Sequence, residues 1–276
     1  MMDIQNTSGD YGFKINKVGV TDIKYPITIK SREDRLITTV GSFSMYVSLD
    51  RNLKGTNMSR LPIILSELND NNWVLKELRQ DIKTLLETML LRMNSDDGYI
   101  ELLFDFFTKK KAPVSDFIGM MPYKCKIKAS LHRNKDEDAE RKYDFVLIVE
   151  VPITTLCPCS KAISENSAHS QRGYVQVSLR ADNFIFIEEI IEVVEAESSC
   201  EVYPILKRID EKYVTEKAYK NPRFVEDIVR LIAEKLYTDN RVNWFKVSSR
   251  HQESIHPHDA MAEIEINKSC LESKDD

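Results

Sequence analysis

Apolar and polar residues alternate along several segments of the chain, and this two-residue period predicts β-strands. The segments with this period in the first half are residues 23–30, 36–49, 99–107 and 117–131. Those in the second half are residues 143–153, 173–180, 242–249 and 260–267. The clearest case is 173–180, where Val175, Val177 and Leu179 alternate toward one face.

Between these strands the apolar residues follow a helical period. The segments with this period are residues 59–69, 74–93, 186–198 and 221–237. The third carries Ile187, Ile190, Ile191 and Val194, the i, i+3, i+4, i+7 spacing of one helix face. In the fourth we expect Asn221 as the N-cap and Pro222 at the first helical position, where its missing N–H costs nothing.

The order of the predicted elements is the same in the two halves of the chain. Each half has two strands, two helices and two more strands, and the charged stretch 132–142 between the halves is typical of a solvated linker. We therefore expect an α+β fold made of two ββααββ units, with antiparallel sheets and helices packed on one face. The predicted boundaries are 1–134 for the first unit and 135–276 for the second.

Composition and charge narrow the classes of function. Hydrophobic residues make up 42% of the 276 residues and charged residues 30%, values typical of a globular protein with a substantial core. The net charge of −5 argues against binding to nucleic acid or to an anionic membrane. The start of the chain has no apolar segment of the signal-peptide kind, and five cysteines are too few and odd in number for a disulfide framework. These features predict a cytoplasmic protein with free or metal-ligating thiols.

Candidate chemistry begins with the stretch TTLCPCSKAISENSAHSQRG at residues 154–173. Cys157 and Cys159 could project to one side of an extended chain, and His169 precedes the next strand, so a hairpin could bring the three together. A disulfide across one residue would be strained, which argues against a redox pair. On spacing alone, two buried inert cysteines are slightly favoured over a metal site.

A second polar cluster lies near the C-terminus, in the stretch SSRHQESIHPHDA. It holds His251, Glu253, His256 and His258, and three of the five histidines of the chain are therefore in this cluster. An exposed polar loop remains an alternative, for His251 in particular. Between the clusters, the stretch YPILKRIDEKYVTEKAYKNPRFVED is interpreted from its residues alone as a solvated loop leading into a helix.

These segments, together with GTNMSR at residues 55–60, resemble the signature of the type IB GTP cyclohydrolases. The motifs occur in the family's order and cover most of the second half. The family belongs to the tunnelling-fold superfamily, whose unit is the ββααββ element, and its members carry two units per subunit. The resemblance implies a homotetramer that converts GTP and water to 7,8-dihydroneopterin 3′-triphosphate and formate. That reaction is the first step toward folate-type pterins and toward deazapurine-modified tRNA bases.

The resemblance also implies roles for individual residues. Cys157, His169 and Glu211 match the ligands of one divalent metal, and a sulfur, nitrogen and oxygen set suits Zn²⁺ while tolerating Mn²⁺ or Fe²⁺. The expected catalytic residues are Cys159, Glu253 and His256, and the expected substrate-binding residues are Glu226, Arg60 and Arg172. A carboxylate at Glu226 can accept two hydrogen bonds from N1–H and the exocyclic amine of guanine. His251 and His258 have no assigned role.

Three alternatives stay open at the level of sequence. One is the archaeal-like branch of the family, which gives a cyclic phosphate product. Another is a nitrile reductase of the same superfamily, although its Glu-Ser-Lys-Ser stretch and a Gly-rich dinucleotide loop are both missing from the sequence. The last is a non-catalytic binding module stabilised by metal. A structural zinc site uses about four ligands, so it would leave Glu253 and several histidines without a role. Their presence argues against a purely structural metal site.

Overall fold

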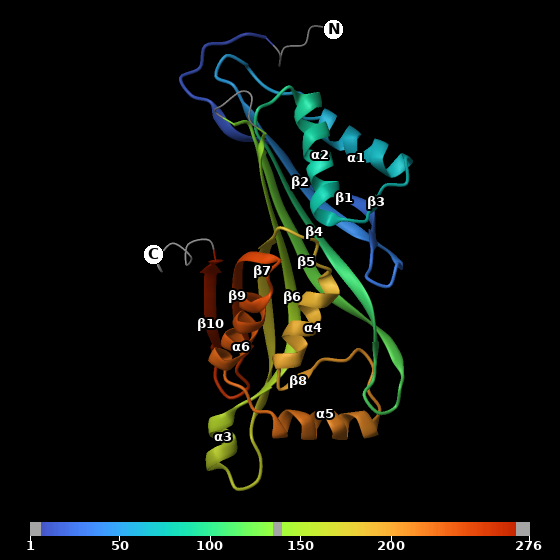
Figure 1. The fold of residues 1–276 in the computed structure, drawn as a ribbon, viewed down its shortest axis with the longest axis vertical. Coiled ribbons are helices and arrows are strands. Elements are labelled where there is room, and N and C mark those ends of the chain that lie inside the picture. Colours follow the sequence, from blue (N-terminus) through green and yellow to red (C-terminus); the bar gives the residue numbers. More distant parts are fainter. Residues whose placement is uncertain (1–6, 135–139, 269–276) are drawn as a thin grey trace. The chain divides into compact units, whose positions relative to one another are not determined.

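A computed structural model of the protein describes residues 7–134 and 140–268. The strands in chain order are β1 (Ile15–Lys30), β2 (Leu36–Leu49), β3 (Val74–Leu75), β4 (Gly98–Lys111), β5 (Ile118–His132), β6 (Lys142–Leu156), β7 (Ser170–Ala181), β8 (Cys200–Glu201), β9 (Val242–Gln252) and β10 (Asp259–Asn267). The helices are α1 (Arg60–Asp70), α2 (Leu78–Met93), α3 (Pro158–Ile163), α4 (Ile187–Glu197), α5 (Arg208–Lys220) and α6 (Val225–Thr238) (Figure 1).

The chain forms two compact units. Unit 1 comprises Met1–Asp105 and Lys126–Leu147, and unit 2 comprises Phe106–Cys125 and Ile148–Asp276. The long strands β4, β5 and β6 therefore contribute a segment to each unit. The expected boundary between residues 134 and 135 borders residues 135–139, which lie outside the described residues, and it stays a prediction.

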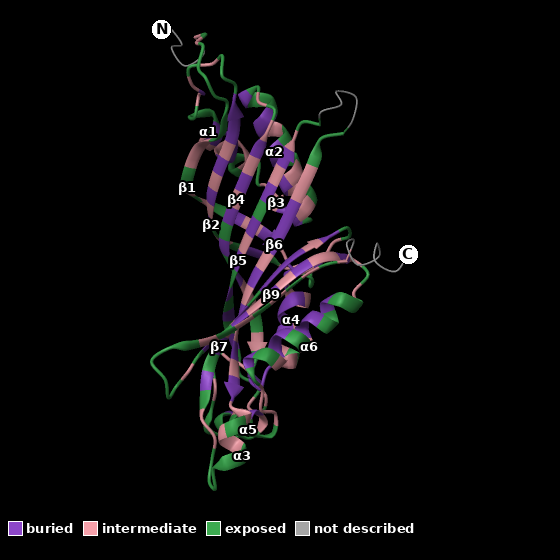
Figure 2. Ribbon diagram, turned by 90° about the vertical axis from the view of Figure 1, so that its left-hand side faces the viewer, coloured by how far each residue is buried: buried purple, intermediate pink, exposed green. Residues whose placement is uncertain are grey.

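In unit 1, β2 pairs antiparallel with both β1 and β4, and the two-residue β3 pairs parallel with β1. Buried and less buried residues alternate over 41–47 of β2, where Phe43, Met45 and Val47 are buried, as the alternating pattern predicts (Figure 2). The helix expected from residue 74 begins only at Leu78. Asp81 explains the difference, because its carboxylate accepts hydrogen bonds from the backbone N–H groups just before the helix, at 2.6 and 2.8 Å.

In unit 2, β7 and β10 flank β9 in antiparallel register, and β8 pairs with β6. Helix α6 packs on β9 and β10 and against α4, with Ile228 and Ile232 fully buried. The α+β class with an antiparallel sheet and packed helices is thus confirmed. Among the described residues, no helix is long and apolar enough to cross a membrane.

The expected start of α6 is wrong by several residues. Asn221 does not cap α6; it is the C-cap of α5, and its amide Nδ2 donates to the Ser198 carbonyl at 2.7 Å. The helix begins at Val225, where the Asp227 carboxylate accepts from the backbone N–H of Phe224 at 2.9 Å. The helix begins at Val225 and not at Pro222 because the Asp227 carboxylate both caps the first turn and interacts favourably with the helix dipole.

Helix α5 was missed by the sequence patterns, and one buried carboxylate holds it in place. Asp210 is fully buried, and it accepts hydrogen bonds from the backbone N–H groups of Val114, Ser115 and Lys207 at 2.8 to 2.9 Å. Burial alone would raise the pKa of this carboxyl group. The hydrogen bonds from Ser115 and from the backbone outweigh burial and hold the pKa at about 2. Asp210 therefore ties the first turn of α5 to the turn between β4 and β5.

We expect Asp210→Asn to lower the melting temperature at pH 7 by roughly 5 °C, because the amide presents a donor to backbone donors. The folded pKa is depressed, so the carboxylate's contribution is complete above the unfolded pKa near 3.8 and is lost as pH falls toward about 2. The difference between variant and wild type should therefore shrink over that interval. Thermal unfolding followed by circular dichroism at pH 7 and pH 3 measures both quantities.

Glu216→Gln is the matched control on the same helix. Glu216 makes an exposed ion pair with Lys212 at 3.8 Å, and such pairs contribute little to stability. Equal melting temperatures for Asp210→Asn and wild type would show that Asp210 does not anchor α5.

Candidate active site

The turn between β6 and β7 brings Cys157 and His169 side by side. The backbone N–H of Cys157 donates to the carbonyl of His169 at 3.1 Å. Cys157 is also the N-cap of α3, and its Sγ accepts from the Ser160 N–H at 3.5 Å. The Ser160 hydroxyl in turn accepts from the His169 N–H at 3.2 Å. These bonds close the loop, so the two expected ligands keep a fixed backbone relation.

His169 connects this turn to the end of β9. Its Nδ1 lies 2.9 Å from Gln171 Oε1 and 4.0 Å from Glu253 Oε2. A carbonyl oxygen only accepts, so this hydrogen bond requires a proton on Nδ1, and in the neutral Nδ1–H tautomer Nε2 has its lone pair available. A second partner that fixes the tautomer in this way is typical of histidines that ligate metals. The structure thus brings Glu253 close to His169, and the catalytic role of Glu253 stays a prediction.

Strand register explains why these side chains share a face. Gly173 of β7 pairs with His251 of β9, and side chains two residues apart in a strand point to the same side. Gln171 and Glu253 therefore extend outward from the same face on which His251 lies. The inner end of this face is buried, and its outer end reaches the turn of Cys157 and His169.

Other expected site residues are not brought together. Glu211 is exposed in the first turn of α5, and Cys159 is exposed on α3. Across residues 7–134 and 140–268, no three His, Cys, Asp or Glu side chains gather closely enough to hold a metal ion. His256 and His258 stack on each other in an exposed turn, with ring centroids 5.1 Å apart. The complete ligand set and the role of His256 stay predictions.

Glu226 lies in the first turn of α6 and is exposed, as its position off the apolar stripe predicts. The histidine near it is His251, which is only 1% exposed, so the alternative of an exposed loop is wrong for this residue. Burial lowers the pKa of His251 to about 4, and the charge of the Glu226 carboxylate acts against this shift. The two side chains are therefore within electrostatic range of one another.

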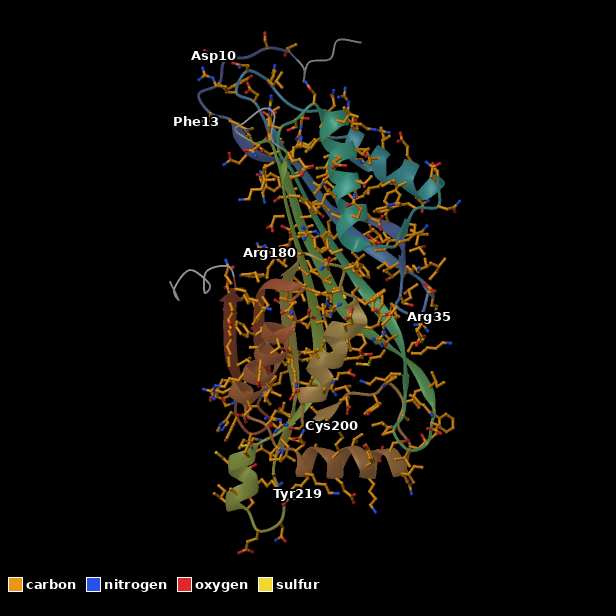
Figure 3. All side chains as sticks on the ribbon, viewed as in Figure 1. Asp10, Phe13, Arg35, Arg180, Cys200 and Tyr219 are labelled. Atoms are coloured by element: carbon orange, nitrogen blue, oxygen red, sulfur yellow. The ribbon has the colours of Figure 1, made fainter. Side chains whose placement is uncertain are left out.

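A hollow of about 380 Å³ lies between the ends of β6 and β7, β8 and helix α5. Its β7 residues are Ser170 and Arg172, which alternate with Gln171 and therefore lie on the other side of the strand from Gln171 and His251. Arg172, Thr215 and Tyr219 are among the residues that line it. Figure 3 labels Tyr219 on α5 and Cys200 on β8, both of which belong to the lining. Arg172 gives the hollow an exposed cation of the kind that binds phosphate. Burial raises the pKa of the Cys200 thiol to about 12, so this cysteine is protonated and unreactive at neutral pH.

Two partly buried charge pairs that no sequence pattern indicated lie close to the hollow, which Glu201 lines. Lys217 donates to both carboxylate oxygens of Glu201, at 2.6 and 2.7 Å. Nearby, Glu195 accepts from Lys110 at 2.5 Å and from the Tyr123 hydroxyl at 2.8 Å, although burial still raises its pKa. The partners of Glu195 lie 72 and 85 residues away in sequence, so no local pattern could indicate them.

Arg60 belongs to unit 1, where it begins α1. Its Nη1 donates to the carbonyl of Arg92 at the end of α2, at 3.0 Å. This bond satisfies a carbonyl at a helix C-terminus, which is a structural role. A role in binding triphosphate stays a prediction for Arg60.

Comparisons with known proteins bear on the whole chain. Residues 1–262 match the family model described as type I GTP cyclohydrolase folE2. The GTP cyclohydrolase FolE2 of Syntrophobacter fumaroxidans is 42% identical over 97% of this chain and 100% of its own length. That of Halorhodospira halophila is 43% identical, over 97% of this chain and 99% of its own.

Solved structures with a similar fold include urate oxidase from Bacillus subtilis, with a TM-score of 0.55, 7% identity, and coverage of 92% of this chain and 99% of that one. The uricase of Arthrobacter globiformis gives a TM-score of 0.54 at 9% identity, over 91% and 93% of the two chains. At such identities the likeness concerns the fold alone. It confirms the expected tandem tunnelling-type architecture.

Proposed function

The chain belongs to the FolE2 family of type I GTP cyclohydrolases, and from that premise we propose that it converts GTP and water to 7,8-dihydroneopterin 3′-triphosphate and formate. It is an enzyme of folate-type pterin biosynthesis with GTP as its substrate. The observation that carries the assignment is 42% identity over 97% of the chain. The finer subtype, type IB, is also our proposal and rests on the four sequence motifs.

We place the reaction at the outer end of the β6, β7 and β9 face. Cys157 and His169 would hold one divalent ion, and the free Nε2 of His169 and the thiol of Cys157 are suitable donors. Glu211 completes the proposed set of sulfur, nitrogen and oxygen ligands, which suits Zn²⁺, Mn²⁺ or Fe²⁺. When bound, such an ion supplies a water of lowered pKa for attack at C8 of guanine.

The side chains of the chain itself would bind the substrate and move its protons. Glu226 accepts hydrogen bonds from N1–H and the exocyclic amine of guanine, a pattern that adenine does not offer. His256 donates the proton that N7 needs for the imidazole ring to open. Glu253, 4.0 Å from His169 Nδ1, and Cys159 take part in the later proton transfers. Arg172 at the hollow and Arg60 are the proposed contacts for the triphosphate.

Free thiols support a cytoplasmic location, which is our proposal. Cys157, Cys159 and Cys200 form no disulfide, and a reducing compartment keeps such residues reduced.

We also propose a homotetramer, as the family resemblance implies. Light scattering should then give about four times the 32.0 kDa mass of one chain. A fully active monomer would refute the proposed assembly.

The metal proposal predicts that chelation removes activity and that an added divalent ion restores it. Cys157→Ser and His169→Ala should each reduce bound metal to background, measured by elemental analysis of the purified protein. Glu211→Gln tests the third ligand separately, because the structure does not bring Glu211 to the other two.

Cys200→Ser is the matched control, since this protonated, buried thiol is not a ligand candidate. It should retain wild-type metal content. Full turnover by a metal-free preparation would rule out the proposed centre, and metal retained by His169→Ala would remove that residue from it.

The guanine proposal predicts that Glu226→Gln lowers GTP turnover by at least roughly tenfold, because a donor then faces a donor on the base. Metal content should stay at the wild-type level. The control is Glu234→Gln, an exposed glutamate on the same helix, which should leave turnover unchanged. Pterin release is followed by fluorescence, and wild-type turnover by Glu226→Gln, or equal turnover of ATP, would contradict guanine recognition by this carboxylate.

A further inference from the structure

His251 is a buried histidine with no role in the mechanism above. It lies on β9 with 1% of its surface exposed, and it pairs in register with Gly173 of β7. A Cβ atom at position 173 would lie 3.0 Å from His251 Cδ2 and 2.9 Å from Ile153 Cγ1. The imidazole therefore occupies space that a side chain on the neighbouring strand would take.

One ring nitrogen of His251 has a partner and the other has none. Nδ1 lies 3.4 Å from the hydroxyl of Thr155, and Thr155 is itself fully buried. Nε2 is buried and has no hydrogen-bond partner among the described residues. A buried polar atom left in this way is costly, and such an atom in a native protein usually serves a purpose.

The chemistry of the ring indicates what the free nitrogen can offer. Burial keeps the imidazole neutral at neutral pH, so it carries a single proton. If the Thr155 hydroxyl donates to Nδ1, that proton is on Nε2, which becomes a donor without an acceptor. The charged group that acts on the ring is the carboxylate of Glu226, in the first turn of α6.

We propose that His251 is a positioning residue for Glu226: its Nε2–H is the donor that orients the Glu226 carboxylate when the guanine base binds. An ionised carboxylate has about four lone-pair sites, so it can accept from N1–H and the amine of guanine and still accept from His251. A third hydrogen bond would fix the plane of the carboxylate at the orientation in which both guanine donors reach it. The inference rests on the proposed role of Glu226 in GTP recognition.

The competing interpretation is that His251 only fills space under α6. Both interpretations predict that a substitution lowers stability, so stability does not separate them. They differ in specificity, because only an oriented carboxylate reads both donors of guanine. ITP lacks the exocyclic amine, and the ratio of kcat/KM for GTP to that for ITP measures how well this second donor is read.

The experiment is a double-mutant cycle of His251→Phe and Glu226→Gln in the full-length, metal-loaded enzyme. We expect His251→Phe to lower kcat/KM for GTP by about tenfold, mainly through KM, and to reduce the preference for GTP over ITP. In the Glu226→Gln background the same substitution should have little further effect. Multiplicative losses, or an unchanged preference for GTP over ITP in His251→Phe, would overturn the proposal.

Further variants distinguish loss of the His251 donor from misfolding of the protein. His251→Gln keeps a side-chain N–H donor and should recover part of the preference for GTP, whereas a preference as low as in His251→Phe would refute the donor role. Gly173→Ala should displace the imidazole without removing it and so weaken the preference for GTP. Ser249→Ala is the control: this hydroxyl is also buried without a partner, two residues away on the same strand, and its removal should leave the preference unchanged.

Failure of this proposal and failure of the proposed function give different results. A wild-type enzyme that releases no pterin from GTP contradicts the function itself. An active wild type with independent effects of the two substitutions contradicts only the positioning role of His251.

Discussion

In unit 2 the pairing of Gly173 with His251 fixes the register of β7 against β9. Because strand side chains alternate, a shift by one residue would turn every candidate side chain on these strands to the opposite face. The observed register puts apolar residues such as Val177 and Val247 at the inner end of the face. Polar residues follow toward its outer end, where His169 meets Gln171 and Glu253. The apolar core and the candidate site are therefore two ends of one packed surface.

Rigidity of the site follows from its hydrogen bonds to secondary structure. The loop of Cys157 and His169 is closed by the backbone hydrogen bond between these two residues and by the Ser160 hydroxyl. The opposite wall is held by the pair of Glu201 and Lys217. Both side chains are partly exposed, 35% for Lys217 and 19% for Glu201, and the pair joins β8 to α5 beside the hollow.

The sequence predicted those features that depend on short-range patterns. Alternation located the long strands, and the stripe of Ile187, Ile190 and Val194 located α4. Helix α5 was not predicted, because only Asp210 and Ala218 of its residues are buried and it therefore has no apolar stripe. The motifs predicted one site with Cys157, His169 and Glu253; the structure joins Cys157 to His169 by a backbone hydrogen bond and puts Glu253 4.0 Å from His169, and the shared site stays a prediction. The burial of His251 was not predictable, since it depends on a glycine 78 positions earlier in the chain that only strand pairing brings beside it.

The hydrogen bonds between Asp210 and the turn after β4 join two segments that are synthesised at different times. Asp210 bonds to Ser115, 95 residues earlier in the chain, and the receiving turn belongs to a hairpin whose strands are adjacent in sequence. At typical ribosomal rates that hairpin emerges roughly 5 to 20 s before the helix. The turn that supplies the N–H donors to α5 can thus be formed before the helix exists. In nascent chains that end shortly before α5, water would take the place of Asp210 as the hydrogen-bond partner of the Val114 and Ser115 backbone N–H groups.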